Sequence, residues 1–201
     1  MSLIFNGTTI TNVIFNDTEL TELRFDEVAV WKSPYIYLLL DNETHSIAAT
    51  STLSISGAVT IPNTFNGVAI TEIATSGFAD CVSITSVVIP DGVTKIGTSA
   101  FSGCSAITDV TIPNSVTNFG NYAFRNCTSL NSITVPSGTT TIGKYAFSDC
   151  SKINSIMIPV SVTNIGYAAF YRCTSLNTLN YEGTTEQWSA ITKGDYWNGD
   201  V

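Results

Sequence analysis

The chain has 201 residues, of which 44% are hydrophobic and only 12% are charged, and its formal net charge is −8. This length predicts one domain, or one domain with a small appendage. The acidic balance without a Lys/Arg cluster argues against nucleic acid or anionic membrane as a partner. The longest apolar run, Tyr35 to Leu40, is far shorter than the roughly 20 residues of a membrane-spanning helix, so we expect no membrane insertion.

The first 32 residues repeat with a period of ten. Phe5, Phe15 and Phe25 mark one position of this period, and Asn or Asp follows each of them. The pattern predicts three related strands joined by Asn-Gly and Asn-Asp turns, which form a small β-module over residues 1–32. So short a unit buries little surface alone, and we expect Trp31 to contact the rest of the chain or a partner.

This module resembles short Phe-Asn-Gly units, ending in Val-Trp, of bacteriophage and prophage structural proteins. No basic region followed by an apolar run opens the chain, so the sequence shows no secretory signal. The location therefore stays open between a cell surface, with a leader removed, and a phage particle assembled inside a cell.

A second domain is predicted over residues 33–201. It begins with two apolar segments, Tyr35–Leu40 and His45–Ala48, separated by Asp41–Thr44, which predict a β-hairpin over residues 35–50. His45 is the sole histidine of the chain, and no Ser or Cys nucleophile is placed near it. We interpret His45 as a strand or turn residue.

From about residue 60, one pattern returns every 23 residues: an Ile/Val-Pro pair, then Ile/Phe-Gly, Ala-Phe and Cys. A fixed period of this size predicts a solenoid in which equivalent residues of successive coils stack. Alternating apolar residues before each Pro predict one short strand, and the pair before each Gly predicts a second. The interval from Pro62 to Phe78 is five residues longer than in later repeats.

Three further residues recur in the second half of each repeat: a Gly, a Phe and a Cys. The Gly after the second strand demands either a positive φ or close backbone contact. The Phe side chains are expected to form an aromatic spine, and Ala-Phe with the Cys three residues later predicts a single helical or 3₁₀ turn. The Phe positions are Phe78, Phe101, Phe124, Phe147 and Phe170.

The five cysteines occupy one position of the repeat. Stacked thiols with parallel Cβ vectors have poor disulfide geometry, and ligands 23 residues apart with one His do not form a zinc site, so we interpret them as core packing. We expect neither a metal nor a cofactor. The cysteines are Cys81, Cys104, Cys127, Cys150 and Cys173.

The repeat pattern ends in the segment 181–201, which we expect to cap the solenoid. Thr184 is a candidate N-cap, Glu186 lies in the first turn, and Trp188 and Ile191 are spaced for one helix face. A short closing helix that lays the indole over the last coil is therefore expected.

The repeat resembles the BspA-type, or Treponema-type, leucine-rich repeat of bacterial surface proteins, whose pattern is IP-x-x-V-x-x-I-G-x-x-A-F-x-x-C-x-x-L. The resemblance covers about residues 35–191. It implies a β-rich leucine-rich-repeat solenoid, a right-handed α/β-type superhelix with short strands and short helical or 3₁₀ turns, beside the small N-terminal β-unit.

Aromatic and Arg side chains, which dominate binding hot spots, gather around the predicted helical turn and form a candidate partner-binding flank. With one His and few charges, catalysis is not expected. The leading hypothesis is a noncatalytic protein that binds a protein or glycan in adhesion or phage-borne recognition. The alternative is a structural subunit that assembles through residues 1–32. The candidate residues are Tyr122, Arg125, Tyr145, Tyr167, Tyr171 and Arg172.

Overall fold

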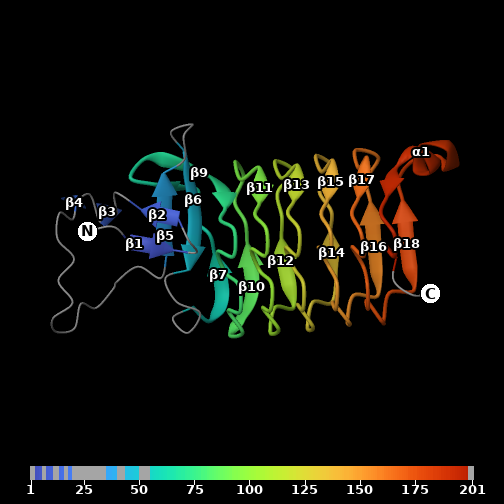
Figure 1. The fold of residues 1–201 in the computed structure, drawn as a ribbon, viewed down its shortest axis with the longest axis horizontal. Helices are drawn as coiled ribbons and strands as arrows, with labels where there is room; N and C mark the ends of the chain where they lie inside the picture. Colours follow the sequence, from blue (N-terminus) through green and yellow to red (C-terminus); the bar gives the residue numbers. More distant parts are fainter. Residues whose placement is uncertain are drawn as a thin grey trace.

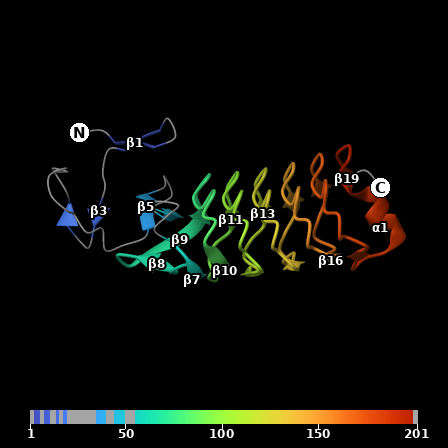
Figure 2. The same ribbon diagram turned by 90° about the horizontal axis from the view of Figure 1, so that it is seen from below.

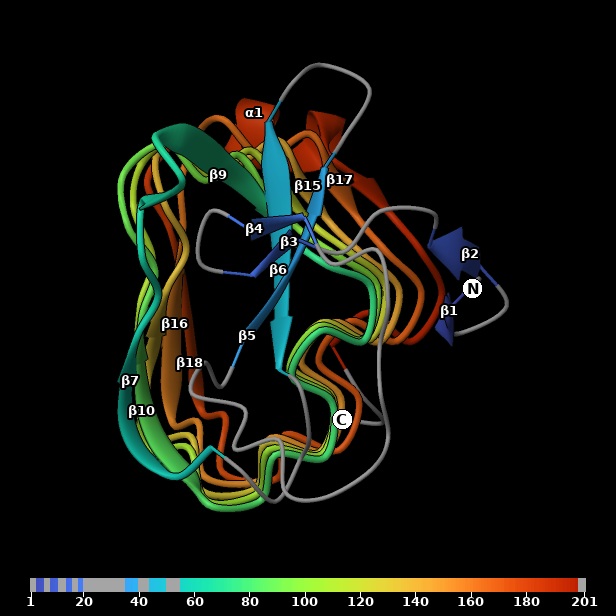
Figure 3. The ribbon, with the colours of Figure 1, turned by 90° about the vertical axis from the view of Figure 1, so that its left-hand side faces the viewer.

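The computed structural model describes residues 3–5, 8–10, 14–15, 18–19, 35–39, 44–49 and 55–198. Over residues 55–198 the chain winds into coils that stack along one axis (Figure 1). A view turned by 90° shows the coils as successive loops of nearly equal shape (Figure 2), and their outlines superimpose when the molecule is seen along the axis (Figure 3). The predicted solenoid is confirmed.

The first strand of each coil pairs in parallel with its counterparts. These strands form two three-stranded sheets, in the orders β7-β10-β12 and β14-β16-β18. Val87 pairs with Val110, and Ile133 pairs with Ile156, so partners are equivalent residues of successive repeats. The strands are β7 (Gly57–Thr60), β10 (Ile84–Val88), β12 (Asp109–Thr111), β14 (Ile133–Thr134), β16 (Ser155–Ile158) and β18 (Thr178–Tyr181).

The second strand of each coil belongs to a nine-stranded sheet. Its parallel register is again set by the repeat, because Ile96 pairs with Phe119 and Phe119 with Ile142. The strands are β9 (Val68–Ile73), β11 (Lys95–Ile96), β13 (Asn118–Phe119), β15 (Thr141–Ile142), β17 (Asn164–Ile165) and β19 (Thr192–Lys193).

A β-hairpin covers the first coil. Strands β5 (Tyr35–Leu39) and β6 (His45–Ala49) pair antiparallel, as the sequence predicted, and β6 continues the large sheet by pairing in parallel with β9. The five extra residues after Pro62 form a second hairpin, in which β8 (Thr64–Phe65) pairs antiparallel with β9. Asn66 and Gly67 at its turn both have positive φ, which is typical of a two-residue hairpin loop.

The repeat glycines permit close stacking of the coils. Gly120 and Gly143 do not have positive φ. A Cβ on Gly143 would lie 2.6 Å from the backbone C and O atoms of Gly120, and one on Gly120 would lie 2.6 Å from the backbone C of Gly97. The sequence left open whether these glycines adopt a positive φ or allow close backbone contact. The structure shows close backbone contact at Gly120 and Gly143.

The Ala-Phe segments are turns and not the helical or 3₁₀ turns expected. Hydrogen bonds spanning three residues do occur, for example from Ala100 N to Gly97 O at 3.2 Å and from Cys104 N to Phe101 O at 3.2 Å. Left-handed residues such as Ser99 and Gly103 interrupt each segment, however, so a regular helix cannot continue. Among the described residues, only Thr185–Ala190 forms a helix.

Left-handed conformations recur at two positions of the coil. The first position lies two residues before the repeat Phe, and Tyr196 takes it in the last coil. The second position lies four residues after the first. Residues at the first position are Ser76, Ser99, Tyr122, Tyr145, Ala168 and Tyr196, and those at the second are Asp80, Gly103, Asn126, Asp149 and Arg172.

The five repeat Phe rings form the predicted spine along the core. Neighbouring rings are nearly parallel, with centroids 5.1 Å apart for Phe101 and Phe124 and 5.7 Å apart for Phe124 and Phe147. All five side chains are buried. Stacked aromatic pairs stabilise a core beyond the area they bury, so this spine ties each coil to the next.

The cysteines pack beside this spine and also donate hydrogen bonds. The Sγ of Cys104 donates to Phe78 O at 2.9 Å, and the Sγ of Cys127 donates to Phe101 O at 3.2 Å. All five thiols are buried and free. Desolvation raises the pKa of Cys81 to about 11 and the pKa of Cys127 to about 12. The thiols therefore remain protonated at neutral pH.

The helix α1 (Thr185–Ala190) closes the last coil, as expected. Thr184 is its N-cap, and the reciprocal bonds between Thr184 and Gln187 form a capping box. Trp188 packs against the core, and its ring centroid lies 5.2 Å from that of Tyr181 and 5.5 Å from that of Trp197. The chain then returns to the large sheet through β19.

The ten-residue period near the N-terminus corresponds to hairpins. β1 (Leu3–Phe5) pairs antiparallel with β2 (Thr8–Ile10), and β3 (Ile14–Phe15) with β4 (Thr18–Glu19). Each of the first two copies thus contains two strands, where the sequence analysis expected one. Phe25 and Trp31 lie outside the described residues, so the third copy and the domain boundary near residue 32 stay predictions.

Candidate functional site

The six candidate residues come from one flank of three successive coils. Tyr122 and Tyr145 occupy the first left-handed position, whereas the next coil has Ala168 there and carries its tyrosine one residue earlier, at Tyr167. Tyr196 takes the same left-handed position in the last coil. We call this group, which comprises Tyr122, Arg125, Tyr145, Tyr167, Tyr171, Arg172 and Tyr196, the tyrosine flank.

Four of its rings form a continuous row across the coils. The rings of Tyr122 and Tyr145 stack with centroids 5.1 Å apart and planes 6° from parallel. Tyr167 then packs edge to face, 5.3 Å from Tyr145 at 61° and 5.8 Å from Tyr196 at 75°. The shift of the tyrosine from position 168 to 167 therefore turns a flat stack into an angled cluster.

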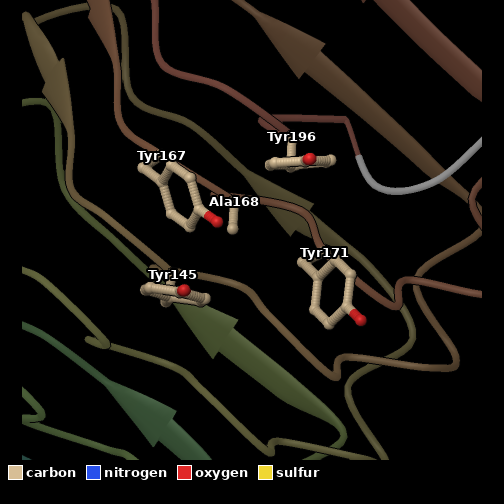
Figure 4. Close-up of a pocket in the computed structure, with 5 residues that line it drawn as sticks. All are labelled: Tyr145, Tyr167, Ala168, Tyr171 and Tyr196. Carbon is tan, nitrogen blue, oxygen red and sulfur yellow. The ribbon is translucent and has the colours of Figure 1, made fainter.

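This change of angle opens a recess with a volume of about 450 Å³. Figure 4 shows its lining: the Tyr145, Tyr167 and Tyr196 rings lie around the small side chain of Ala168, and Tyr171 lies on the other side of Ala168 from Tyr167. Ala168 is fully buried, while Tyr196 is 56% exposed at the rim. The recess is therefore an aromatic-walled site that is open to solvent.

Charged groups surround the flank. The Asp149 carboxylate lies 3.9 Å from Arg125 Nε and 3.8 Å from Arg172 Nη1, so one acid from the middle coil joins arginines of both neighbouring coils. The guanidinium carbon of Arg125 lies 5.8 Å from the Tyr122 ring centroid, and that of Arg172 lies 5.7 Å from the Tyr171 centroid. Each arginine thus holds both an anionic and an aromatic partner.

The Tyr167 hydroxyl is held in its neutral form. Desolvation raises the pKa of Tyr167, and its interaction with the Tyr145 hydroxyl raises that pKa further. A neutral phenol both donates and accepts hydrogen bonds. The recess therefore offers polar contacts beside its ring faces.

The structure brings together most of what the sequence predicted, and it adds two residues. Tyr122, Tyr145 and Tyr167 lie in one row, and Tyr171 lines the recess with the last two of them. Sequence reasoning missed Asp149 and Tyr196. A signal for Tyr196 exists, because Gly194-Asp195-Tyr196 repeats the Gly-x-Tyr of Gly120 to Tyr122, displaced by the five additional residues of the last coil.

His45 has a structural role, and the face of the first strands carries no apolar patch. His45 is buried in β6, where its ring packs edge to face against Phe65 at 5.7 Å, and desolvation lowers the pKa of His45. The face of the first strands carries isolated exposed apolar side chains, Val88 and Met157, each 41% exposed. Single apolar residues of this kind are common on protein surfaces and do not form a patch.

Two features are absent from the described part of the chain. In that part, no group of three or more His, Cys, Asp or Glu side chains converges as metal ligands would. No helix in the same residues has the length and apolarity to cross a bilayer.

Comparisons with known proteins identify the repeat. The model of the BspA-type leucine-rich repeat region matches residues 71–191 in six copies. A leucine-rich cell surface protein of Faecalibacterium prausnitzii A2-165 is 35% identical with a TM-score of 0.72, over 79% of this chain and 40% of that one. The match thus covers less than half of the length of that protein. A comparison with curated proteins finds no match.

Two further solved structures share the fold. The leucine-rich repeat protein of T. pallidum is 26% identical with a TM-score of 0.64, over 80% of this chain and 83% of that one. A leucine-rich repeat protein of Bacteroides ovatus is 24% identical with a TM-score of 0.54, over 77% of this chain and 47% of that one. The family model covers more than half of the chain and agrees with the observed coils, so this chain belongs to the BspA-type leucine-rich repeat family.

Proposed function

We propose that this chain is a noncatalytic binding protein of a bacterial cell surface, and that it binds a protein or glycan ligand through the tyrosine flank. The observation that carries the proposal is the row of partly exposed tyrosines that ends in an aromatic-walled recess. Aromatic and Arg side chains supply most of the binding energy in protein interfaces. The description of the F. prausnitzii relative as a cell surface protein supports the location.

The composition of the flank favours binding over a purely structural role. Tyr122 and Tyr145 occupy a left-handed position, where a bulky residue is unfavourable and where Ser99 and Ala168 serve the same fold in other coils. Residues held in such conformations often have a functional reason. The tyrosines therefore add something that the solenoid does not need.

An array of extracellular matrix proteins and of bacterial and host glycans tests this proposal. The full chain should bind at least one class of ligand, and Tyr145→Ala and Tyr171→Ala should each weaken that binding about tenfold or more, as expected for hot-spot residues. The matched controls are Val88→Ala and Met157→Ala on the first-strand face. Binding that is lost in these controls and kept in the tyrosine variants would place the binding site elsewhere.

A second candidate function, a structural subunit, is favoured by the N-terminal strands. In the described residues β1 pairs only with β2, and β3 only with β4. An isolated two-stranded hairpin is marginally stable in water, so these pairs would gain from additional strands of a partner. Light scattering of the full chain and of a variant without residues 1–32 tests this function: a strictly monomeric full chain would count against it. The family match and the solved relatives lend no support to carriage on a phage particle.

A further inference from the structure

The recess around Ala168 differs from the rest of the tyrosine flank in the orientation of its rings. Between Tyr122 and Tyr145 the ring faces cover one another, since their planes are 6° from parallel. At the recess, Tyr167 is inclined by 61° to Tyr145 and by 75° to Tyr196. Ring faces and edges of different orientation therefore line one volume, as Figure 4 shows.

Angled aromatic walls favour a compact ligand over a flat one. A weakly hydrated cation is attracted to each aromatic face that lies within about 6 Å of it. Cages of this kind recognise quaternary ammonium groups. Their walls here come from three consecutive coils, because Tyr145 lies in one coil, Tyr167 and Tyr171 in the next, and Tyr196 in the last.

Charge also favours a cation. The chain carries 16 acidic and 8 basic residues, for a net charge of −8. Asp195 directly precedes Tyr196, which lines the recess. Arg172 lies beside Tyr171 but does not line the recess, and it shares the Asp149 carboxylate, 3.8 Å away, with Arg125.

We propose that the recess formed by Tyr145, Tyr167, Tyr171 and Tyr196 around Ala168 binds a quaternary ammonium group, of the kind carried by choline or by trimethylated lysine. This inference deepens the proposed function, because it names the chemical group on the ligand that the tyrosine flank recognises. Binding in the recess requires the small side chain of Ala168, because a larger side chain at this position would fill the floor of the recess.

The test is titration of the full chain with choline, followed by NMR of tyrosine ring signals and by calorimetry. The matched control ligand is 3,3-dimethyl-1-butanol, which has the shape of choline without its charge. Choline should bind saturably, and the neutral analogue should bind about tenfold more weakly, because cation–π attraction supplies the difference. Phosphocholine and trimethyl-lysine amide, titrated in parallel, distinguish a phosphocholine-bearing surface from a methylated protein as the source.

Variants locate the site. Tyr171→Ala should weaken choline binding about tenfold, and Val88→Ala, on the face of the first strands and outside the tyrosine flank, should change it less than about twofold. Tyr196→Leu, at the exposed rim, provides a second recess variant if Tyr171→Ala does not fold. Equal affinity for choline and its neutral analogue, binding of methyl glucoside in place of choline, or no saturation by about 50 mM choline would overturn the inference.

These outcomes are separable from those of the proposed function. A chain that binds ligands on the array through the tyrosine flank but does not bind choline would retain the proposed function and lose only this inference.

Discussion

The rings of Tyr122 and Tyr145 stack 5.1 Å apart, although both residues have left-handed backbone conformation, with φ of 60° and 55°. Their amide groups hold this conformation by donating to the next coil, from Tyr122 N to Lys144 O at 2.8 Å and from Tyr145 N to Tyr167 O at 2.9 Å. A bulky residue at positive φ destabilises the fold, and the stacking of the two rings offsets part of that free-energy cost. Its rings are presented on the flank, where a ligand can reach them.

Tyr145→Asn separates the role of this residue in folding from its role in binding. Asn tolerates the left-handed conformation well, so relief of backbone strain should offset the lost stacking, and the free energy of unfolding should change by less than about 1 kcal/mol. Binding to ligands of the flank should still fall. Denaturant unfolding and binding assays on one protein preparation check both parts, and Ser99→Asn, at the equivalent position of an earlier coil, is the control. A loss of several kcal/mol would show that the tyrosine is structural.

Phe124→Ala tests the aromatic spine. Phe124 is fully buried between Phe101 and Phe147, with ring centroids 5.1 Å and 5.7 Å away. Removal of a buried Phe ring should lower the free energy of unfolding by about 3–5 kcal/mol, because transfer energy and cavity cost add. Urea denaturation measures the change, with the exposed Thr128→Ala as control. A change below about 1 kcal/mol would mean that the coils are not joined through this spine.

Gly143→Ala and Gly92→Ala form a matched pair. Gly143 lacks positive φ, but its new Cβ would lie 2.6 Å from the Gly120 backbone, whereas Gly92 has φ of 98° and open space around it. Forcing two coils apart should cost about 2–3 kcal/mol or more in Gly143→Ala, and conformational strain alone should cost about 1 kcal/mol in Gly92→Ala. Thermal and denaturant unfolding should rank the two in this order, and the reverse ranking would contradict the close-stacking role of Gly143.

Alkaline pH should unfold the chain through its buried thiols. Burial raises the pKa of Cys127 from 9.0 to about 12, so between these values the unfolded state loses the thiol proton while the folded state keeps it. Stability is therefore complete below pH 9 and falls as the pH rises toward 12. In Cys127→Ser, the free energy of unfolding should fall with pH less steeply, by about 1.4 kcal/mol per pH unit. Urea titrations at several pH values measure this slope. Identical slopes in both proteins would show that Cys127 ionises as readily in the folded state.

The repeat, the paired strands and the two caps could be predicted from the sequence because each depends on short-range chemistry. A period of 23 residues fixes which side chains stack, and Thr184 followed by Glu186 marks a helix start within one turn. The turn after Gly120 could not be predicted as such, since its Ala-Phe-x-x-Cys spacing also fits a helix. Only the left-handed φ of Tyr122 and Asn126 distinguishes the two.

Six residues of the tyrosine flank were proposed from the sequence, but Tyr196 and the shape of the recess were not. Tyr167 follows Tyr145 by one residue less than a full repeat, and that single offset sets the angle between their rings. The wall supplied by Tyr196 depends on how α1 returns the chain to the stack, which a repeat pattern does not encode. The recess thus results from departures from the repeat.

The most direct test of the central claim, that the tyrosine flank is the binding surface, is the dissociation constant of the tightest ligand on the array, measured by biolayer interferometry. The double variant Tyr145→Ala/Tyr171→Ala and the double variant Val88→Ala/Met157→Ala are compared with the unmodified chain. We predict a loss of about 100-fold or more in the first and less than about twofold in the second. Unchanged affinity in the first, with a loss in the second, would contradict the claim.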